Sequence, residues 1–198
     1  SLRISFDSKG LSSFDTNFLA SFLCASAKPQ MVVEHDPNLP TPPFIREPKR
    51  SDKNMTLVMD LDETLIHYPD DKLSSFEDSA HQHILVRPFT TRFLTEIAEH
   101  YEIVIFTAAS QNYADRLIDI IDENRVISHR LYRQHMTVHN NTLVKDISKI
   151  GRDLRKVIIL DNTPENFVLQ PDNGVYVKSW RGNTNDKVFL LLSPLFIN

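Results

Sequence analysis

The chain has 198 residues, of which 41% are hydrophobic and 24% are charged, and its formal net charge is −4. This size and composition allow one compact domain with a substantial core. The negative charge argues against a general nucleic-acid-binding protein, and the single cysteine, Cys24, excludes an internal disulfide. No apolar run reaches the roughly 20 residues that a membrane-spanning helix needs.

The charge is unevenly distributed along the chain. Between Arg130 and Arg181 there are nine basic and five acidic residues, a surplus of +4, so the remainder carries −8. A basic segment beside an acidic one favours an anionic substrate. Ordinary solvated helix faces explain the same count equally well, so charge alone does not decide between the two.

Residues 1–50 differ in composition from the rest. They contain six of the eleven prolines, all between Pro29 and Pro48. The run 39–44 is predicted to be extended, because proline lacks the amide donor that a helix needs, whereas 12–22 has apolar residues at helical spacing. We therefore predict a proline-rich N-terminal arm over 1–50, followed by a folded domain over 51–198.

Beyond Lys53, apolar runs of strand length alternate with amphipathic helical patterns. Strands are expected at 55–59, 102–106, 156–160 and 175–177, short extended pieces at 131–132 and 142–144, and helices at 89–100, 111–123 and 184–196. This alternation predicts an α/β fold, a Rossmann-like parallel sheet with helices on both faces. Ligands of such sheets bind beyond the carboxyl ends of the strands.

The first predicted strand ends in two aspartates, Asp60 and Asp62. Residues two apart on an extended chain point to the same side. Two carboxylates this close repel each other unless they share a proton or a cation. Phosphoryl transfer uses both arrangements, since a metal neutralises phosphate oxygens and a protonated carboxyl assists the leaving group. The spacing alone is weak evidence, because loops are rich in aspartate.

Polar residues also follow the other predicted strands. Thr107 ends the second strand, Asp161 and Asn162 end the third, and Lys145 follows the apolar pair 143–144. Carboxylate and amide oxygens suit Mg²⁺, and a lysine balances carboxylates and phosphate. Each residue also has an ordinary explanation: Asn162 as a helix cap, Thr107 as a strand-end hydroxyl and Lys145 as a surface cation.

These residues occur in one order, within four short motifs: Asp60-Leu61-Asp62-Glu63-Thr64, Phe106-Thr107-Ala108, Val144-Lys145-Asp146 and Ile159-Leu160-Asp161-Asn162. They resemble the four motifs of the haloacid dehalogenase superfamily. More narrowly, they are similar to the small phosphatases of the RNA polymerase II carboxy-terminal domain, which have an NLI-interacting-factor-like domain. The resemblance covers about residues 53 to 197. It implies a haloacid dehalogenase-like fold with a small insertion, about 66–86, instead of a full cap domain.

The resemblance also implies catalytic roles for matching residues. Asp60 would attack phosphorus and become an aspartyl phosphate. Asp62 would protonate the leaving oxygen and then deprotonate the hydrolytic water. Thr107 and Lys145 would bind the phosphoryl oxygens, and Asp161 would complete the catalytic set.

A magnesium ion is the cofactor that the resemblance implies. It would be held by the Asp60 side chain, the Asp62 backbone carbonyl and Asn162, with waters positioned by Asp161. Arg133 matches a family position near the substrate. Together these roles describe a Mg²⁺-dependent phosphatase that hydrolyses phosphoserine or phosphothreonine of another protein.

The segment from Ile66 to Val86 departs from the polymerase-directed members. Those members have a longer insertion there, with an apolar pocket for the substrate, whereas this segment is short and acidic. It is too short for a lid domain, and an open site suits a phosphorylated protein. The polymerase domain remains one candidate substrate. We also expect no direct nucleic-acid contact, no membrane segment and a monomer. The expected location is intracellular, in the nucleus or cytoplasm, with a mitochondrial location as the open alternative.

Two other functions stay open. A mitochondrial inner-membrane import receptor resembles the same family and acts as a protein-binding module without catalysis. That relative lacks the intact acidic pair, whereas Asp60 and Asp62 are both present here. A metal-dependent nuclease is the other alternative. It would use metal-activated water instead of a carboxylate nucleophile, and the net charge disfavours it.

Overall fold

The computed structural model describes residues 39–46, 53–69 and 84–197. The helix predicted over 12–22 and most of the predicted arm lie outside these ranges. Within them, no helix combines the length and the apolar character that crossing a bilayer requires.

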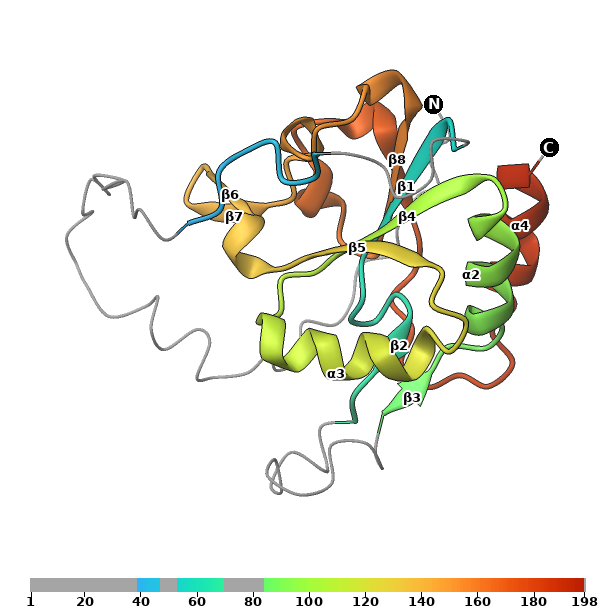
Figure 1. Cartoon of the computed structure of the whole chain (residues 1–198). Coiled ribbons are helices and arrows are strands. Elements are labelled where there is room, and N and C mark those ends of the chain that lie inside the picture. The colour runs from blue at the N-terminus through green and yellow to red at the C-terminus, as the bar shows by residue number, and fades with distance from the viewer. Residues whose placement is uncertain (1–38, 47–52, 70–83, 198) are drawn as a thin grey trace. The chain divides into compact units, whose positions relative to one another are not determined.

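A five-stranded parallel sheet forms the centre of the described domain (Figure 1). Its strands, in the order β5-β4-β1-β8-β9, are β5 (Ile127–Leu131), β4 (Tyr101–Phe106), β1 (Met55–Met59), β8 (Val157–Asp161) and β9 (Gly174–Tyr176). All residues of β4 and four of the five in β1 are buried. Burial on both faces is what the continuous apolar runs predict, because parallel sheets are covered on both sides.

The three described α-helices pack against one face of the sheet. They are α2 (Thr90–Ala98), α3 (Gln111–Ile121) and α4 (Val188–Ile197). The apolar residues of these helices form one hydrophobic cluster with the strand residues that point to the same face of the sheet, among them Leu57 and Ile103. Successive strand residues point to opposite faces, so Val58 and Val104 belong to a second cluster on the other face.

Short 3₁₀ helices, rather than α-helices, cover that second face in the described part of the chain. Ile147 in η4 (Ile147–Lys149) and Phe167 in η6 (Pro164–Phe167) pack there. The predicted α/β fold with a Rossmann-like sheet is confirmed. The two faces differ because the apolar residues that cover the second face lie on short connections and are not spaced as one face of an α-helix.

Residues 39–46, which the composition assigns to the N-terminal arm, form part of the folded domain. The amide of Ile45 donates to the carbonyl of Ile150 at 3.0 Å. Ile45 is 3% exposed and belongs to the second hydrophobic cluster. The described residues 39–46 therefore pack with the folded domain, whereas the rest of the predicted arm lies outside the described residues.

Two antiparallel pairs flank the main sheet (Figure 1). β2 (Ile66–His67) pairs with β3 (Leu85–Val86), so the two ends of the predicted insertion lie side by side. β6 (Thr137–His139) pairs with β7 (Thr142–Val144). The pattern had indicated only 142–144 as extended.

A buried carboxylate, Glu102, ties three elements of the sheet to the loop before β8. Its oxygens accept hydrogen bonds from Arg152 Nε at 2.7 Å and Nη2 at 2.8 Å, and from Thr56 Oγ1 at 3.1 Å. His129 Nε2 lies 3.1 Å from Glu102 Oε1. Glu102 itself is 3% exposed. A carboxylate this deep is tolerated only with such partners.

Glu102→Gln should lower the free energy of unfolding by about 2–4 kcal/mol at pH 7, since it leaves Arg152 without its anionic partner. Burial raises the pKa of Glu102, but the hydrogen bonds from Arg152 and His129 outweigh it and lower that pKa from 4.5 to about 2. The unfolded chain therefore binds a proton at Glu102 more tightly than the folded chain does. The stabilisation is full above pH 4.5 and is lost as the pH falls towards 2.

Urea unfolding of both proteins at pH 7 and pH 3 checks this prediction. The difference between wild type and variant should shrink at pH 3. Glu99→Gln, at an exposed position nearby, is the matched control and should stay within about 0.5 kcal/mol of wild type. An equal loss for Glu102→Gln at both pH values would contradict the argument.

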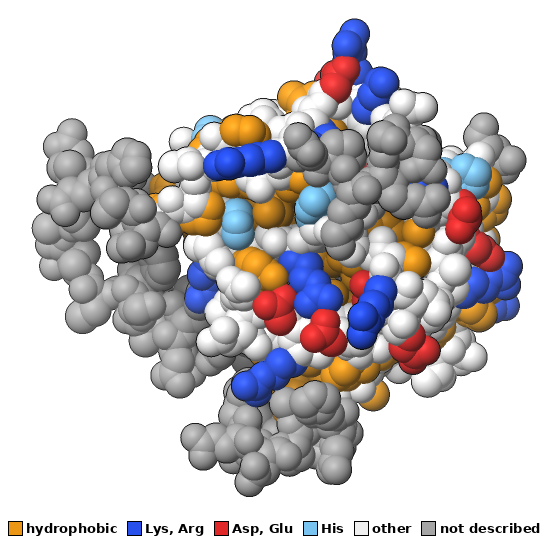
Figure 2. Space-filling view, viewed as in Figure 1, with side chains coloured by type: hydrophobic (Ala, Val, Ile, Leu, Met, Phe, Trp, Pro, Cys, Tyr) orange, Lys and Arg blue, Asp and Glu red, His pale blue; other side chains and the backbone are white. Residues whose placement is uncertain are grey.

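The basic surplus between residues 130 and 181 is largely neutralised by neighbouring carboxylates. Arg130, Arg152 and Arg155 each form an ion pair at 2.7 Å or less. In Figure 2 the blue side chains near the centre of the visible face lie beside red ones, and the other blue side chains are scattered. The charge surplus of the sequence therefore does not translate into a matching basic patch on that face.

Candidate active site

Polar side chains gather where β1, β4 and β8 end. Asp60 directly follows β1, Thr107 follows β4, and Asp161 is the last residue of β8. The Asp60 amide donates to the Leu160 carbonyl at 3.0 Å, which continues the parallel ladder into the site. Asp60 is 5% exposed, and Thr107 and Asp161 are fully buried. The predicted meeting of these residues at one edge of the sheet is observed.

Lys145 lies between two of these carboxylates. Its ammonium Nζ is 2.5 Å from Asp60 Oδ1 and 2.6 Å from Asp161 Oδ2. The lysine is fully buried, and its amide donates to the Asn166 carbonyl at 2.6 Å. Burial alone would lower the pKa of Lys145, but Asp60 and Asp161 outweigh it and raise that pKa. Lys145 is therefore a charged, fixed cation and not a surface lysine.

A tight turn after β1 returns a hydroxyl to the second oxygen of Asp60. Leu61 O accepts the amide of Leu65 at 2.9 Å, and Glu63 adopts a left-handed φ of 59°. This conformation is uncommon for a residue other than glycine. It places Thr64 Oγ1 3.0 Å from Asp60 Oδ2 and 3.3 Å from Asn162 Oδ1. The Asp60 carboxylate thus has Lys145 on one oxygen and Thr64 on the other.

Asp161 and Asn162 are each fixed by further hydrogen bonds. Asp161 Oδ1 accepts from the Thr163 amide at 2.8 Å and from Asn166 Nδ2 at 3.0 Å. Asn162 Nδ2 donates to Ser179 Oγ at 2.9 Å. Because its nitrogen is engaged with Ser179, the amide oxygen of Asn162 faces Asp60 through the Thr64 hydroxyl.

Asp62, two residues after Asp60, receives two hydroxyl donors. Tyr113 OH is 3.0 Å from Asp62 Oδ1, and Thr107 Oγ1 is 3.3 Å from Oδ2. Thr107 Oγ1 also accepts the Ala109 amide at 3.0 Å. The sequence assigned Thr107 to a phosphoryl oxygen, whereas in this structure its hydroxyl bonds Asp62.

The charges of the site leave room for a cation. Asp60, Asp62 and Asp161 carry −3 when ionised, and Lys145 returns +1. Burial raises the pKa of Asp60, and the negative charge of Asp161 raises it further. The positive charge of Lys145 lowers that pKa but does not offset the rise. Burial also raises the pKa of Asp62, and the hydrogen bonds from Tyr113 and Thr107, which lower it, offset only part of that rise. A divalent cation would neutralise the net charge of −2.

The donor set fits a hard ion such as Mg²⁺. The Asp60 carboxylate oxygen and the Asn162 amide oxygen converge on the Thr64 hydroxyl, and oxygen ligands of this kind suit Mg²⁺. In the described ranges, no three His, Cys, Asp or Glu side chains are grouped to hold a metal. An ion here would therefore need the amide of Asn162, backbone oxygen and water in addition to Asp60.

Comparison with known proteins identifies the family. The profile of NLI interacting factor-like phosphatases matches residues 55–198, most of the chain. The chain belongs to the NLI interacting factor-like phosphatase family.

Relatives of this NLI interacting factor-like domain include the probable C-terminal domain small phosphatase of Dictyostelium discoideum. It is 42% identical over 149 residues, which cover 71% of this chain and 49% of that protein. The carboxy-terminal domain RNA polymerase II polypeptide A small phosphatase 2 of Homo sapiens is 39% identical over 149 residues, 71% of this chain and 55% of that protein. The matches thus span about half the length of these relatives.

Among solved structures, Fcp1, an essential RNA polymerase II CTD phosphatase, has a TM-score of 0.52 to this chain. It is 20% identical and covers 72% of this chain and 49% of the Fcp1 chain. At this identity the likeness concerns the fold alone, and it agrees with the parallel α/β architecture described above.

Arg133 lies next to the segment that carries Thr107. It follows the end of β5, its Nε donates to the Ala108 carbonyl at 2.7 Å, and its amide donates to Ala109 O at 3.0 Å. The substrate role of Arg133 remains a prediction. Its position at the carboxyl edge of the sheet suits that role.

The sequence did not assign three residues of this NLI interacting factor-like site. They are Thr64, Tyr113 and Asn166, which hydrogen-bond Asp60, Asp62 and Asp161. The available signal for Tyr113 was its place in the first turn of a helix that directly follows the Thr107 loop.

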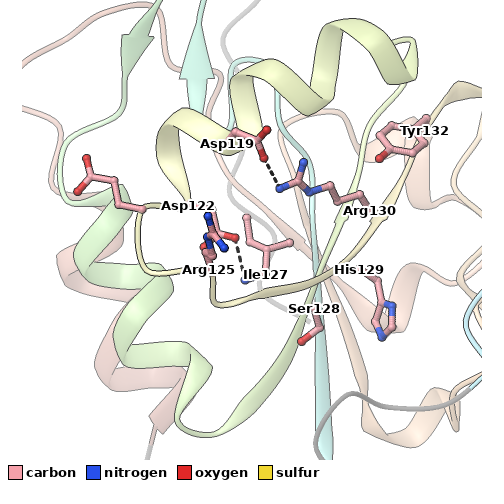
Figure 3. A pocket seen from close by; sticks show the side chains of 9 residues that line it. Asp119, Asp122, Arg125, Ile127, Ser128, His129, Arg130 and Tyr132 are labelled. Carbon is pink, nitrogen blue, oxygen red and sulfur yellow. Dashed lines mark hydrogen bonds and ion pairs between the residues drawn. The ribbon is translucent and has the colours of Figure 1, made fainter.

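A broad hollow of about 750 Å³ lies elsewhere, along the edge strand β5 (Figure 3). It shares no residue with the candidate site. Arg130 in its wall donates to Asp119 at 2.6 Å, and the Asp122 carboxylate accepts the Val126 amide at 2.7 Å. Arg130, Asp119 and Asp122 therefore hold the local structure together.

Proposed function

We propose that this domain is a Mg²⁺-dependent phosphatase that hydrolyses phosphoserine or phosphothreonine of proteins through an aspartyl phosphate on Asp60. The carrying observation is the asymmetric setting of Asp60. One of its oxygens is bound to the Lys145 ammonium at 2.5 Å, and the other faces the Thr64 hydroxyl beside the Asn162 oxygen. A buried carboxylate held in this way suits an oriented nucleophile.

Lys145 has two tasks in this proposal. It holds Asp60 towards the substrate, and its positive charge lowers the repulsion between the Asp60 carboxylate and an anionic phosphate. Asp161 fixes the ammonium from the far side at 2.6 Å. When bound, Mg²⁺ would supply further neutralisation of phosphate oxygens, and Asp60, the Asp62 carbonyl and Asn162 are the groups that would hold it.

Asp62 is the proposed acid and base. Burial raises its pKa, which favours a protonated carboxyl that can protonate the leaving serine oxygen. The resulting carboxylate then takes a proton from the water that attacks the aspartyl phosphate. Asp60 and Asp62 follow the same strand, two residues apart, so they can act on opposite ends of one phosphoester bond.

A phosphorylated protein is the proposed substrate. Relatives at 39–42% identity are named for phosphatases of a polymerase or C-terminal domain, which makes the RNA polymerase II carboxy-terminal domain one candidate. A monomer in the nucleus or cytoplasm, without direct nucleic-acid contact, fits this proposal. The import-receptor-like binding module is less well supported, because binding alone does not require the buried arrangement of Asp60, Asp62 and Lys145.

The test combines trapping with turnover. Beryllofluoride with Mg²⁺ should bind at Asp60 as a mimic of the aspartyl phosphate, measured by ¹⁹F NMR and lost on chelation. A panel of phosphoserine and phosphothreonine peptides, including polymerase heptads, should be hydrolysed only with Mg²⁺. Peptide binding without hydrolysis would favour the binding module, and efficient hydrolysis of sugar phosphates alone would refute a protein substrate.

A further inference from the structure

Tyr113 is the side chain in contact with the proposed acid to which the mechanism above gives no task. It lies partly buried in the first turn of α3. Its phenol oxygen is 3.0 Å from Asp62 Oδ1, while the Thr107 hydroxyl is 3.3 Å from Oδ2. The two oxygens of Asp62 thus have different partners, and the contact with Tyr113 is the shorter.

The unequal partners distinguish the two carboxyl oxygens. A carboxylic acid carries its proton on one oxygen only, and a phenol at neutral pH is a hydrogen-bond donor. With Oδ1 engaged by the Tyr113 hydroxyl, Oδ2 is the oxygen of Asp62 that is better placed to carry a proton towards the substrate. The 3.3 Å contact of Oδ2 with Thr107 is near the limit of a hydrogen bond, so Oδ2 can exchange it for another oxygen.

We propose that Tyr113 is a positioning residue that reserves Oδ1 of Asp62 and thereby directs the acid proton, on Oδ2, to the leaving oxygen of the substrate. This inference rests on the proposed phosphatase function. As the bond between phosphorus and the serine oxygen breaks and the bond to Asp60 forms, the Oδ2 proton moves to the serine oxygen. The products are a free serine hydroxyl, the aspartyl phosphate and an Asp62 carboxylate still bonded to Tyr113.

The test uses the dependence of the rate on the leaving group. A serine alkoxide is a poor leaving group and needs the proton, whereas p-nitrophenolate leaves with little help. In Tyr113→Phe, kcat on a phosphoserine heptapeptide should fall about 10- to 100-fold, against less than about threefold on p-nitrophenyl phosphate. The ratio of the two rates is the readout, because a general loss of folded enzyme leaves it unchanged.

Tyr132→Phe is the matched control. Tyr132 OH donates to Asp115 Oδ1 at 2.6 Å, so it also bonds a carboxylate of α3 but lies outside the Asp62 contacts. Its removal should leave the rate ratio unchanged within about twofold. In an Asp62→Asn background, Tyr113→Phe should likewise leave the ratio unchanged, because the proton that Tyr113 directs is then absent.

The outcomes separate this inference from the function on which it rests. Equal losses on both substrates, or a raised KM for the peptide with an unchanged kcat ratio, would overturn the role of Tyr113 and leave the phosphatase intact. A further fall of the ratio in the Asp62→Asn background would also overturn it. If the unmodified chain with Mg²⁺ hydrolyses neither substrate, the proposed function itself fails.

Discussion

Asp60→Asn should lower kcat by at least about 10⁴-fold on both phosphopeptide and p-nitrophenyl phosphate. An amide has no anionic oxygen with which to attack phosphorus, and neither Asp62 nor Asp161 is oriented to replace it. Asp62 is bonded to Tyr113 and Thr107, and Asp161 to Lys145 and Asn166. Initial rates of purified wild type and variant measure the effect.

The same variant should be as stable as wild type or more so. Burial raises the pKa of Asp60 in the fold, so at neutral pH the charged carboxylate disfavours folding and a neutral amide of the same shape relieves that cost. Thermal melting checks this. Asp119→Asn is the control, because Asp119 is mostly exposed and forms an ion pair with Arg130 outside the site. Residual activity of Asp60→Asn above one percent would remove Asp60 as nucleophile.

Lys145→Met should abolish activity and also destabilise the fold by about 3–5 kcal/mol, because two buried carboxylates lose their shared cation. Lys145 is fully buried between Asp60 and Asp161. Protonation of a carboxylate relieves the repulsion, so the loss should be larger at pH 8 than at pH 5. Denaturant unfolding at the two pH values, without added metal, measures it.

Two further variants make this result specific. Lys149→Met removes a lysine whose side chain is 36% exposed and 3.7 Å from Asp146, and should cost less than about 1 kcal/mol. Lys145→Met combined with Asp60→Asn should recover part of the lost stability, because one of the opposed charges is gone. A fully stable Lys145→Met would show that Asp60 and Asp161 do not depend on the ammonium.

The main residues of the site were predictable from local pattern and chain order. Asp60 and Thr107 each follow a buried parallel strand and Asp161 ends another, and the carboxyl ends of such strands meet at one edge. Lys145 was not predictable in this way, because it follows β7, outside the main sheet. Only its motif pointed to the site. Its complete burial is a property of the tertiary fold.

Other contacts could not be anticipated from the sequence. The hydroxyl of Thr64 reaches Asp60 because Glu63 adopts a left-handed φ, and no residue type at that position signals such a turn. The contact of Tyr113 with Asp62 spans 51 positions in the chain. The strand β5 was underestimated because its polar middle residues are half-exposed at the sheet edge.

The pairing of Ile66 with Val86 closes the base of the segment between them. The Arg87 amide donates to Leu65 O at 2.9 Å, and Arg87 Nη1 donates to the Thr64 carbonyl at 3.1 Å, in the turn that follows Asp60. Whatever stretch of chain joins the two ends therefore leaves and re-enters the domain at one anchored point. The length or composition of that stretch can therefore change without displacing the turn that carries Asp60.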